Sequence, residues 1–307
     1  MDTSQYIKIS DEVQESLVHH KPIVALESTV ITHGLPYPEN LKLGIKIQEE
    51  IRKLDAVPAT IAILKGNIYI GINNSQLELL AQGSDTQKVS PRDIAFVIAQ
   101  GGSGGTTVAG TLFIANSCGI RVFATGGIGG VHRNIVYRGI LNTDISADLT
   151  YLSKTPMMVV CAGAKAILDL PATLEVLETL GVPVVGYQTD EFPAFYSKTS
   201  GLRTQTRVDN PNEIIKLAQI HWGLGQKSAI LICVPPPDEV ALTYENVDSY
   251  IQQALIETEQ MNIQGQAVTP FLLKRMNELT EGASLKVNIA LLLNNARVAA
   301  RIANFLV

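Results

Sequence analysis

Residues 157–163, MMVVCAG, form an uninterrupted apolar run that ends in glycine. Its short length, its paired valines and its glycine ending favour a buried strand over a helix. Six further short apolar runs with β-branched residues are read in the same way: IVALEST (23–29), ATIAIL (59–64), IAFVIAQ (94–100), RVFATGG (121–127), VPVVGYQ (182–188) and AILICVP (229–235). We expect all seven to be strands, and LKGNIYIGI to continue the second run through a tight Gly66-Asn67 turn.

Helical patterns separate these runs, so strands and helices alternate along the chain. The helices are expected at about 39–54, 74–82, 106–118, 171–180, 211–222, 245–262, 269–280 and 284–305. This alternation predicts an α/β layered fold with a largely parallel sheet. No linker, repeat or low-complexity segment divides the sequence, so we expect one domain over residues 1–307. The last helix is apolar on most sides, which predicts a central place or a subunit contact.

Composition excludes several classes of protein. The net charge of the 307 residues is −5 and the Lys and Arg residues are scattered, so we expect no nucleic-acid polymer as a partner. Cys118, Cys161 and Cys233 have no CxxC spacing, which indicates a reducing compartment. The N-terminus is polar and acidic, and no uncharged apolar stretch approaches the roughly 18 residues of a membrane span. These features predict a soluble, cytoplasmic protein.

Two glycine-rich segments follow strands, but neither is a standard nucleotide motif. TGGIGGVHR has His132 where a dinucleotide fingerprint needs Gly or Ala, and GGSGGTT lacks the Gly-Lys-Ser/Thr of a Walker A motif. In GGSGGTT, Gly101, Gly102, Gly104 and Gly105 precede a helix that is expected to begin near Thr106. Its first N–H groups and two hydroxyls would make an anion cradle. The alternative is a flexible strand-to-helix turn.

Two ionisable residues stand at strand ends, where ligands bind in such folds. Lys165 ends MMVVCAGAK. A lysine desolvated there would favour its neutral amine, which can attack a carbonyl-like carbon, but it could instead cap the sheet and reach solvent. Glu27 lies within the apolar IVALEST. It is either a proton donor or the structural partner of a buried cation.

Four other polar residues leave alternatives open. Asp144 and Asp148 in DISAD would share one helix face, and a carboxylate with waters suits Mg²⁺ or Mn²⁺. The same pattern is typical of a helix N-cap. His132 could bind a substrate or be structural, and Asn288, on the apolar last helix, needs a partner if it is buried.

Several sequence blocks, in the right order, resemble the pseudouridine-5′-phosphate glycosidase family, whose members are also described as similar to an indigoidine-cluster protein. The blocks are ALESTVITHGLPYPEN, AVPATIAIL, KVSPRD, GGTTVAGT, VFATGGIGGVHR, DISADL, VVCAGAKAILDLPATLEVLETLGVPVVGYQTDEFPAF, TPFLLKRMNELTEG and SLKVNIALLLNNA. They extend from about residue 21 to 300. The resemblance implies a three-layer α/β/α sandwich with a mostly parallel central sheet, assembled as a homotrimer.

The resemblance also implies roles for individual residues. Glu27 would be the proton donor and Lys165 the nucleophile. Asp144 would hold one Mn²⁺ per subunit, with Mg²⁺ or another divalent ion as the alternative. The residues implied to contact the substrate are Lys88, Val108, Ser146, Ala147 and Asp148, mostly around the phosphate, with His132 and Asn288 near the nucleotide. One segment departs from the family pattern: NIVYRGILNT (134–143) is longer than expected, has Asn134 in place of glycine, and leads into the metal ligand.

The implied activity is that of a lyase-type C-glycosidase in nucleotide catabolism, which reversibly cleaves pseudouridine 5′-phosphate to uracil and ribose 5-phosphate. The bond broken is C–C, and carbon 5 of uracil has no lone pair for an acid to protonate, unlike the leaving atom of an ordinary glycosidase. Attachment of Lys165 to C1′ of a ring-opened ribose would solve this problem through a Schiff base. The rivals are an aldolase-like Schiff-base lyase acting on another sugar phosphate, a nucleotide-binding regulator that has lost catalysis, and a purely structural trimer.

Overall fold

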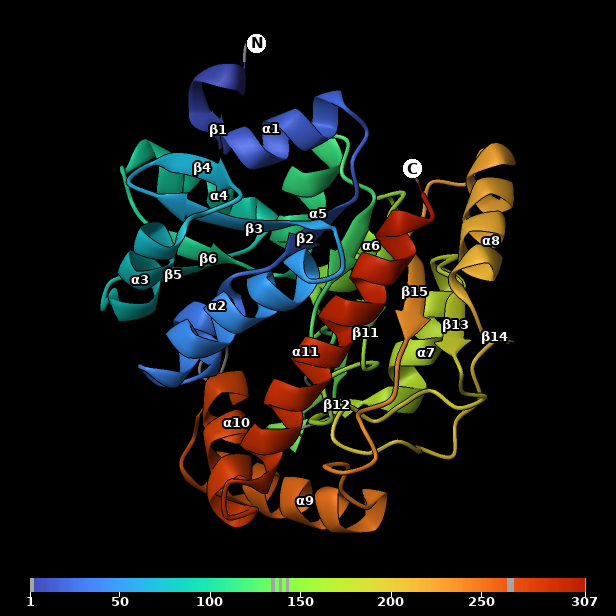
Figure 1. The fold of residues 1–307 in the computed structure, drawn as a ribbon. Helices are drawn as coiled ribbons and strands as arrows, with labels where there is room; N and C mark the ends of the chain where they lie inside the picture. Colours follow the sequence, from blue (N-terminus) through green and yellow to red (C-terminus); the bar gives the residue numbers. More distant parts are fainter. Residues whose placement is uncertain (1–2, 134–135, 138–139, 142–143, 264–267, 307) are drawn as a thin grey trace.

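The structure is a computed structural model that describes residues 3–133, 136–137, 140–141, 144–263 and 268–306 (Figure 1). The strands of its main sheet are β1 (Ile7–Ile9), β2 (Ile23–Leu26), β3 (Val57–Leu64), β4 (Asn67–Ile70), β5 (Gln87–Val89), β6 (Gly104–Thr106), β7 (Val122–Ala124), β11 (Met158–Cys161), β13 (Val184–Tyr187), β14 (Thr206–Val208) and β15 (Ile230–Cys233). Two short antiparallel pairs join β8 (Val131–His132) to β12 (Leu168–Asp169) and β9 (Val136–Tyr137) to β10 (Ile140–Leu141).

Helices connect these strands. They are α1 (Asp11–Val18), α2 (Glu39–Arg52), α3 (Asn74–Gln82), α4 (Pro91–Ala99), α5 (Val108–Ser117), α6 (Ala147–Leu152), α7 (Leu170–Thr179), α8 (Pro211–Gly223), α9 (Tyr244–Gln260), α10 (Val268–Leu279) and α11 (Ala283–Asn304). A 3-10 turn, η1 (Thr3–Tyr6), begins the described chain, and one π-helical turn, η2 (Val30–Gly34), follows β2.

The main sheet is mostly parallel, as predicted. Its strand order is β1-β4-β3-β2-β7-β11-β15-β13-β14, with β6 attached to β3 and β5 attached to β6. From β3 to β14 every neighbour on this path is parallel, while β4 and β6 run antiparallel to β3. The strands β2, β7, β11, β13 and β15 are buried along their whole length. Continuous apolar runs of this kind are typical of strands that are covered on both faces.

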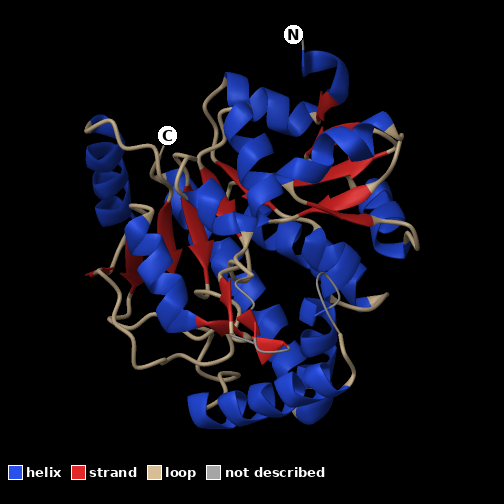
Figure 2. Cartoon of the chain, turned by 180° about the vertical axis from the view of Figure 1, so that it is seen from behind, coloured by secondary structure: helices blue, strands red, loops and turns tan. Residues whose placement is uncertain are grey.

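Helices cover both faces of the sheet. In Figure 1, α2 and α11 lie in front of the strands, and the view from behind in Figure 2 shows further helices on the opposite face. The α11 helix packs against β2, β7 and β11, and its residues Leu291, Ala296 and Ala299 are fully buried. The three-layer α/β/α sandwich is therefore confirmed, as is the central place of the last helix.

The predicted strand IAFVIAQ (94–100) is wrong, because these residues belong largely to α4. Ser90 caps this helix, Pro91 stands in its first turn, and the Asp93 carboxylate accepts the Ser90 N–H at 2.9 Å. Only one side of the helix is buried, since Phe96 is 57% exposed. A short apolar run fits a strand or a helix equally well, and here the capping box at Ser90 indicates a helix.

The helix predicted at about 106–118 is present, but it begins two residues later than expected. Residues Gly104–Thr106 form strand β6, and α5 begins at Val108 with Thr107 as its N-cap. A side chain at Gly105 would collide with the Ser28 carbonyl, so the glycine lets two backbone segments approach closely. The predicted Gly66-Asn67 turn is shifted by one residue. Lys65 and Gly66 have positive φ, and Asn67 already pairs with Leu64 across β3 and β4.

The sheet order places three strand ends side by side. Glu27 follows β2, Thr125 follows β7, and the loop that carries Lys165 follows β11. Because adjacent strands lie about 4.8 Å apart, the ends of β2 and β11 are about 10 Å apart, with β7 between them. Among the described residues no helix is long and apolar enough to cross a membrane.

Candidate active site

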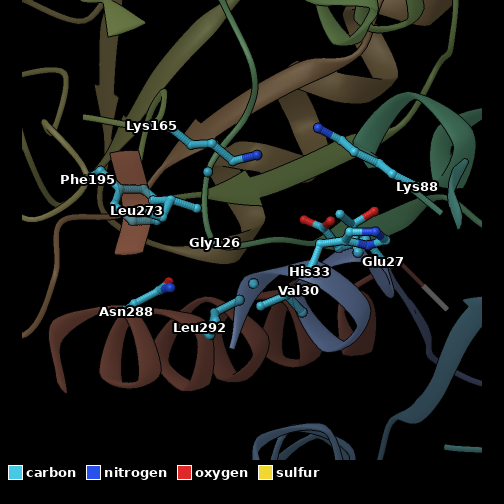
Figure 3. A pocket seen from close by; sticks show the side chains of 13 residues that line it. Glu27, Val30, His33, Lys88, Gly126, Lys165, Phe195, Leu273, Asn288 and Leu292 are labelled. Carbon is cyan, nitrogen blue, oxygen red and sulfur yellow. The ribbon is translucent and has the colours of Figure 1, made fainter. Parts of the chain in front are cut away.

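One pocket gathers four of the residues singled out in the sequence. Glu27, Lys88, Lys165 and Asn288 all line it (Figure 3). Its apolar wall consists of Val30, Phe195, Leu273 and Leu292, from four separate parts of the chain. In Figure 3 the side chains of Lys88 and Lys165 extend into the pocket from opposite sides. Two amines and a carboxyl therefore share a site from which much of the water is displaced.

A second cavity adjoins this pocket. It shares His33, Gly34, Leu273 and Asn288 with the first, so these residues form the boundary between the two. The pocket with the lysines encloses about 70 Å³ and the second cavity about 470 Å³. Ligand sites for small molecules usually measure about 300–1,000 Å³, so the two together have room for a nucleotide-sized ligand.

The loop after β11 holds Lys165 by its backbone. The Lys165 N–H donates to the Ile128 carbonyl at 3.0 Å, and the Ala162 N–H donates to the Gly126 carbonyl at 2.8 Å. Gly163 has a φ of +80°, and a side chain there would collide with the Pro193 carbonyl. This glycine in the predicted CAGAK segment is required for the bend that brings Lys165 back over the end of β7.

Glu27 lies in an environment that favours its protonated form. Burial raises the pKa of Glu27, and the nearby Asp148 carboxylate acts in the same direction. Lys165, the Thr125 hydroxyl and Lys88 lower this pKa but do not outweigh burial. The Thr125 hydroxyl donates a hydrogen bond to the Glu27 carboxylate and so orients it. A carboxyl whose pKa is raised in this way is suited to donate a proton to a ligand.

Lys88 and His33 bring two further nitrogen groups to the pocket. Burial lowers the pKa of Lys88, and the charge of Lys165 lowers it further, against the opposing effect of Asp148, Glu27 and Asp144. Burial also lowers the pKa of His33, with Lys88 as the second cause. The imidazole of His33 is therefore neutral at neutral pH, with its Nδ1 2.7 Å from the Thr32 hydroxyl oxygen.

Asp148 is buried and joins two backbone segments beside the pocket. Its Oδ1 accepts the Ala109 N–H at 2.9 Å and its Oδ2 accepts the Gly129 N–H at 2.8 Å. The Gly110 N–H, at the same helix start, donates to the Thr107 hydroxyl. Two donors of the predicted anion cradle are thus already engaged within the protein, which corrects the prediction of a free cradle at this helix start.

The remaining predicted substrate contacts do not line the pocket of the two lysines. Val108 is 1% exposed at the start of α5, and Ser146 caps α6, whose first residue is Ala147. The Ser146 hydroxyl accepts the Asp148 N–H at 3.2 Å. Their predicted contacts with a phosphate stay predictions.

His132 and Asp144 lie together at the edge of the site. The His132 N–H donates to the Asp144 carbonyl at 3.0 Å, and His132 Nε2 lies 3.9 Å from Asp144 Oδ2. Burial lowers the pKa of His132, against the effect of Asp144. The Asp144 side chain is 51% exposed, so its carboxylate is open to an ion.

The described residues contain no group of three or more His, Cys, Asp and Glu side chains that could hold a metal. A single exposed carboxylate such as Asp144 nevertheless fits an Mg²⁺-like ion that keeps most of its water ligands. The segment 134–143, whose length and Asn134 depart from the family pattern, lies mostly outside the described residues, and its effect on this ion stays a prediction.

Two pocket residues, His33 and Phe195, and the Glu27 partner Thr125 were missed in the sequence. Thr125 directly follows a predicted strand, so the rule that ligands bind at strand ends could have found it. His33 lies in the π-helical turn η2, a form that is frequent at functional sites but has no sequence pattern of its own. Phe195 comes from the irregular segment between β13 and β14, where no periodicity indicates a role.

Comparisons with known proteins agree on one family. The family model described as "Indigoidine synthase A like protein" matches residues 12–305. A protein of Caldanaerobacter subterraneus subsp. tengcongensis named pseudouridine-5′-phosphate glycosidase is 50% identical over 301 residues, which cover 98% of this chain and 96% of the relative. An Escherichia coli K12 protein of the same name is 48% identical over 300 residues, covering 97% and 95% of the two chains.

Two solved structures share the fold over nearly the whole chain. An indigoidine synthase A-like protein of Thermotoga maritima has a TM-score of 0.87 and 37% identity, and the match covers 98% of this chain and 96% of that one. The prealnumycin C-glycosynthase AlnA, solved in complex with ribulose 5-phosphate, has a TM-score of 0.89 and 40% identity, with 98% and 97% covered.

Proposed function

We propose that this chain, which belongs to the indigoidine synthase A like family, reversibly cleaves pseudouridine 5′-phosphate to uracil and ribose 5-phosphate. The name shared by its full-length relatives supports this activity. The pentose phosphate bound by the similar C-glycosynthase supports a ligand of that class. The single observation that carries the proposal is the convergence of Lys165, Glu27 and Lys88 on one pocket at the ends of β2, β7 and β11.

Lys165 acts as the covalent catalyst. The lone pair of its nitrogen attaches to C1′ as the C1′–O4′ bond opens, and the proton that the nitrogen then loses passes to O4′, which becomes the 4′-hydroxyl. Protonation of uracil C5 then lets the C1′–C5 bond break, while the lone pair of the lysine nitrogen forms an iminium at C1′. Water adds to the iminium, and the amine leaves as ribose 5-phosphate is released.

Glu27 supplies the proton that uracil C5 needs. Burial raises the pKa of Glu27, which favours the protonated acid that the cleavage step requires. The hydrogen bond from Thr125 fixes the direction of the carboxyl group. In the reverse reaction the Glu27 carboxylate, which has lost this proton, acts as the base.

Lys88 binds the 5′-phosphate. Its side chain enters the pocket opposite Lys165, so a pentose phosphate spanning the two amines would place C1′ against one and the phosphate against the other (Figure 3). A fixed phosphate orients the sugar, and orientation of this kind can contribute several kcal/mol to lowering the barrier. Ser146, Ala147, Asp148 and Val108, from the adjacent helix starts, complete the phosphate site in this proposal.

Asp144 would hold one Mn²⁺ per subunit, with water in most coordination positions. When bound, such an ion would order water and polar groups around the sugar. His132 and Asn288 bind the nucleotide on either side of the lysines. Assembly as a homotrimer and a cytoplasmic location belong to the same proposal. Free cysteines at positions 118, 161 and 233 support the reducing compartment.

Uracil release from pseudouridine 5′-phosphate, followed by ultraviolet absorbance with and without a chelator, tests the activity. The proposal predicts uracil formation, its loss on chelation and its recovery with Mn²⁺. An enzyme that releases no uracil but cleaves another sugar phosphate would instead be the aldolase-like lyase. Light scattering should give a mass of three chains.

A further inference from the structure

Arg133 joins three segments of the chain next to the pocket. It directly follows β8, and its Nη1 donates to Asp248 of α9 at 2.7 Å. Its Nε donates to the Leu168 carbonyl at 3.3 Å, and its Nη2 to the Ala166 carbonyl at 3.4 Å. The Arg133 side chain is 19% exposed, so solvent screens these contacts only in part.

The two carbonyls belong to the loop that carries Lys165. The backbone on the β11 side of this loop is fixed by bonds from Ala162 and Lys165 to the segment after β7. Beyond Lys165, the Leu168 N–H donates to the Lys165 carbonyl at 3.0 Å, and Leu168 pairs with His132 between β12 and β8. Arg133 thus holds the backbone on the C-terminal side of Lys165.

Asp248 connects Arg133 to the helices α9 and α10 beside the pocket. The α10 helix carries Leu273, which lines the pocket, and α10 packs against α9. Arg275 of α10 binds Glu257 of α9 through two hydrogen bonds, of 2.5 and 2.9 Å. The ion pair between Arg133 and Asp248 therefore links the α9–α10 helix pair, which contributes Leu273 to the pocket, to the segment that carries Lys165.

We propose that Arg133 is a positioning residue that fixes the Lys165 loop in its reactive geometry, with Asp248 as the anchor of its guanidinium. The planar guanidinium can serve one carboxylate and two carbonyls at once, whereas a lysine amine serves them poorly. A misplacement of a nucleophile by about 1 Å can cost about 100-fold in rate. The expected effect on the rate of adduct formation rests on the proposed function. The expected effect on the position of Lys165 does not.

The test compares Arg133→Gln and Arg133→Lys with Arg275→Gln. The last variant removes a comparably buried ion pair within the helix pair and leaves the Lys165 loop untouched. Borohydride trapping with saturating ribose 5-phosphate measures how fast Lys165 forms its adduct. We expect Arg133→Gln to slow trapping by up to about 100-fold, the cost of misplacing a reacting group by about 1 Å. Arg133→Lys should recover part of this loss, and Arg275→Gln should trap at the wild-type rate.

A second measurement does not depend on catalysis. Limited acetylation of the ligand-free protein, read by peptide mass spectrometry, gives the labelling ratio of Lys165 to Lys88 in each variant. We expect this ratio to change in Arg133→Gln and to stay at the wild-type value in Arg275→Gln. If Arg133→Gln keeps both the ratio and the trapping rate and only melts at a lower temperature, its role is structural and the inference is overturned.

The same pair of measurements separates the inference from the proposed function. A wild-type protein that forms no adduct would contradict the covalent mechanism. The labelling ratio would then still decide whether Arg133 positions Lys165, since it requires no substrate.

Discussion

Two clusters in this molecule surround a glutamate with cationic side chains, and they are built in opposite ways. Between α2 and α11, Glu50 accepts hydrogen bonds from Lys53 at 2.8 Å and from Arg297 at 2.6 Å. These two partners lower the pKa of Glu50 to about 2. In the pocket, no ion pair within the described residues joins Glu27 to Lys88 or Lys165, and burial raises the pKa of Glu27.

The difference separates a structural cluster from a reactive one. Between α2 and α11, direct contact with Lys53 and Arg297 keeps Glu50 ionised. This carboxylate therefore does not exchange a proton near neutral pH. The sheet prevents such contact in the pocket, because Glu27 and Lys165 follow strands that are separated by β7. Groups held apart in a water-poor pocket keep the capacity to react with a ligand placed between them.

The largest expected effect of breaking the reactive cluster comes from Lys165→Ala. It should abolish uracil release, because the proposed mechanism takes the nitrogen that attaches to C1′ from Lys165. The melting temperature should stay close to that of the wild type, since the Lys165 side chain makes no ion pair among the described residues. Turnover assays and thermal unfolding check these two expectations. Near-normal turnover in Lys165→Ala would contradict the covalent mechanism.

Glu27→Gln should lower kcat by about 100- to 10,000-fold, the usual contribution of a positioned proton donor. In the wild-type enzyme the protonated form of Glu27 is required for cleavage. Since burial raises its pKa, kcat should hold at pH values where an ordinary glutamate is already ionised, and should fall as the pH rises through the pKa of Glu27. A pH profile of kcat that is unchanged in Glu27→Gln would contradict the assignment of this acid.

Lys88→Ala should act mainly on binding and raise KM for the phosphorylated substrate. Because burial and Lys165 lower the pKa of Lys88, the wild-type KM should begin to rise at a lower pH than an ordinary lysine would cause. Lys88→Arg is the matched control, since a guanidinium stays charged and should remove this rise at alkaline pH. An unchanged KM in Lys88→Ala would rule out the phosphate contact.

Glu50→Gln should have the smallest effect on activity, and it tests the contrast between the Glu50 cluster and the pocket. It should leave kcat and KM unchanged and lower the free energy of unfolding by about 1 kcal/mol, because Lys53 and Arg297 keep access to water after the loss. The folded pKa of about 2 lies below the ordinary 4.5, so the stabilisation is present above pH 4.5 and is lost as the pH falls toward 2. Urea unfolding between pH 2 and 6 should show a larger loss in the wild type than in the variant, because Glu15 and Glu257, whose pKa values are also lowered, remain in both.

Much of the site follows from local sequence, because the residues that end buried strands must meet at one edge of a parallel sheet. Glu27 and Lys165 were found in this way. The strand predicted at 94–100 failed because its apolar residues fit a strand or a helix equally well, and the cap at Ser90 was overlooked. The bonds of Asp148 and the ion pair of Arg133 with Asp248 join residues far apart in the chain, so no local pattern could reveal them.

The most direct test of the account is borohydride reduction of the protein in the presence of ribose 5-phosphate, with the modified peptide identified by mass spectrometry. We predict a stable pentose phosphate adduct on Lys165 and none in Lys165→Ala. An adduct on Lys88 in its place, or an enzyme that releases uracil yet never forms an adduct, would contradict the account.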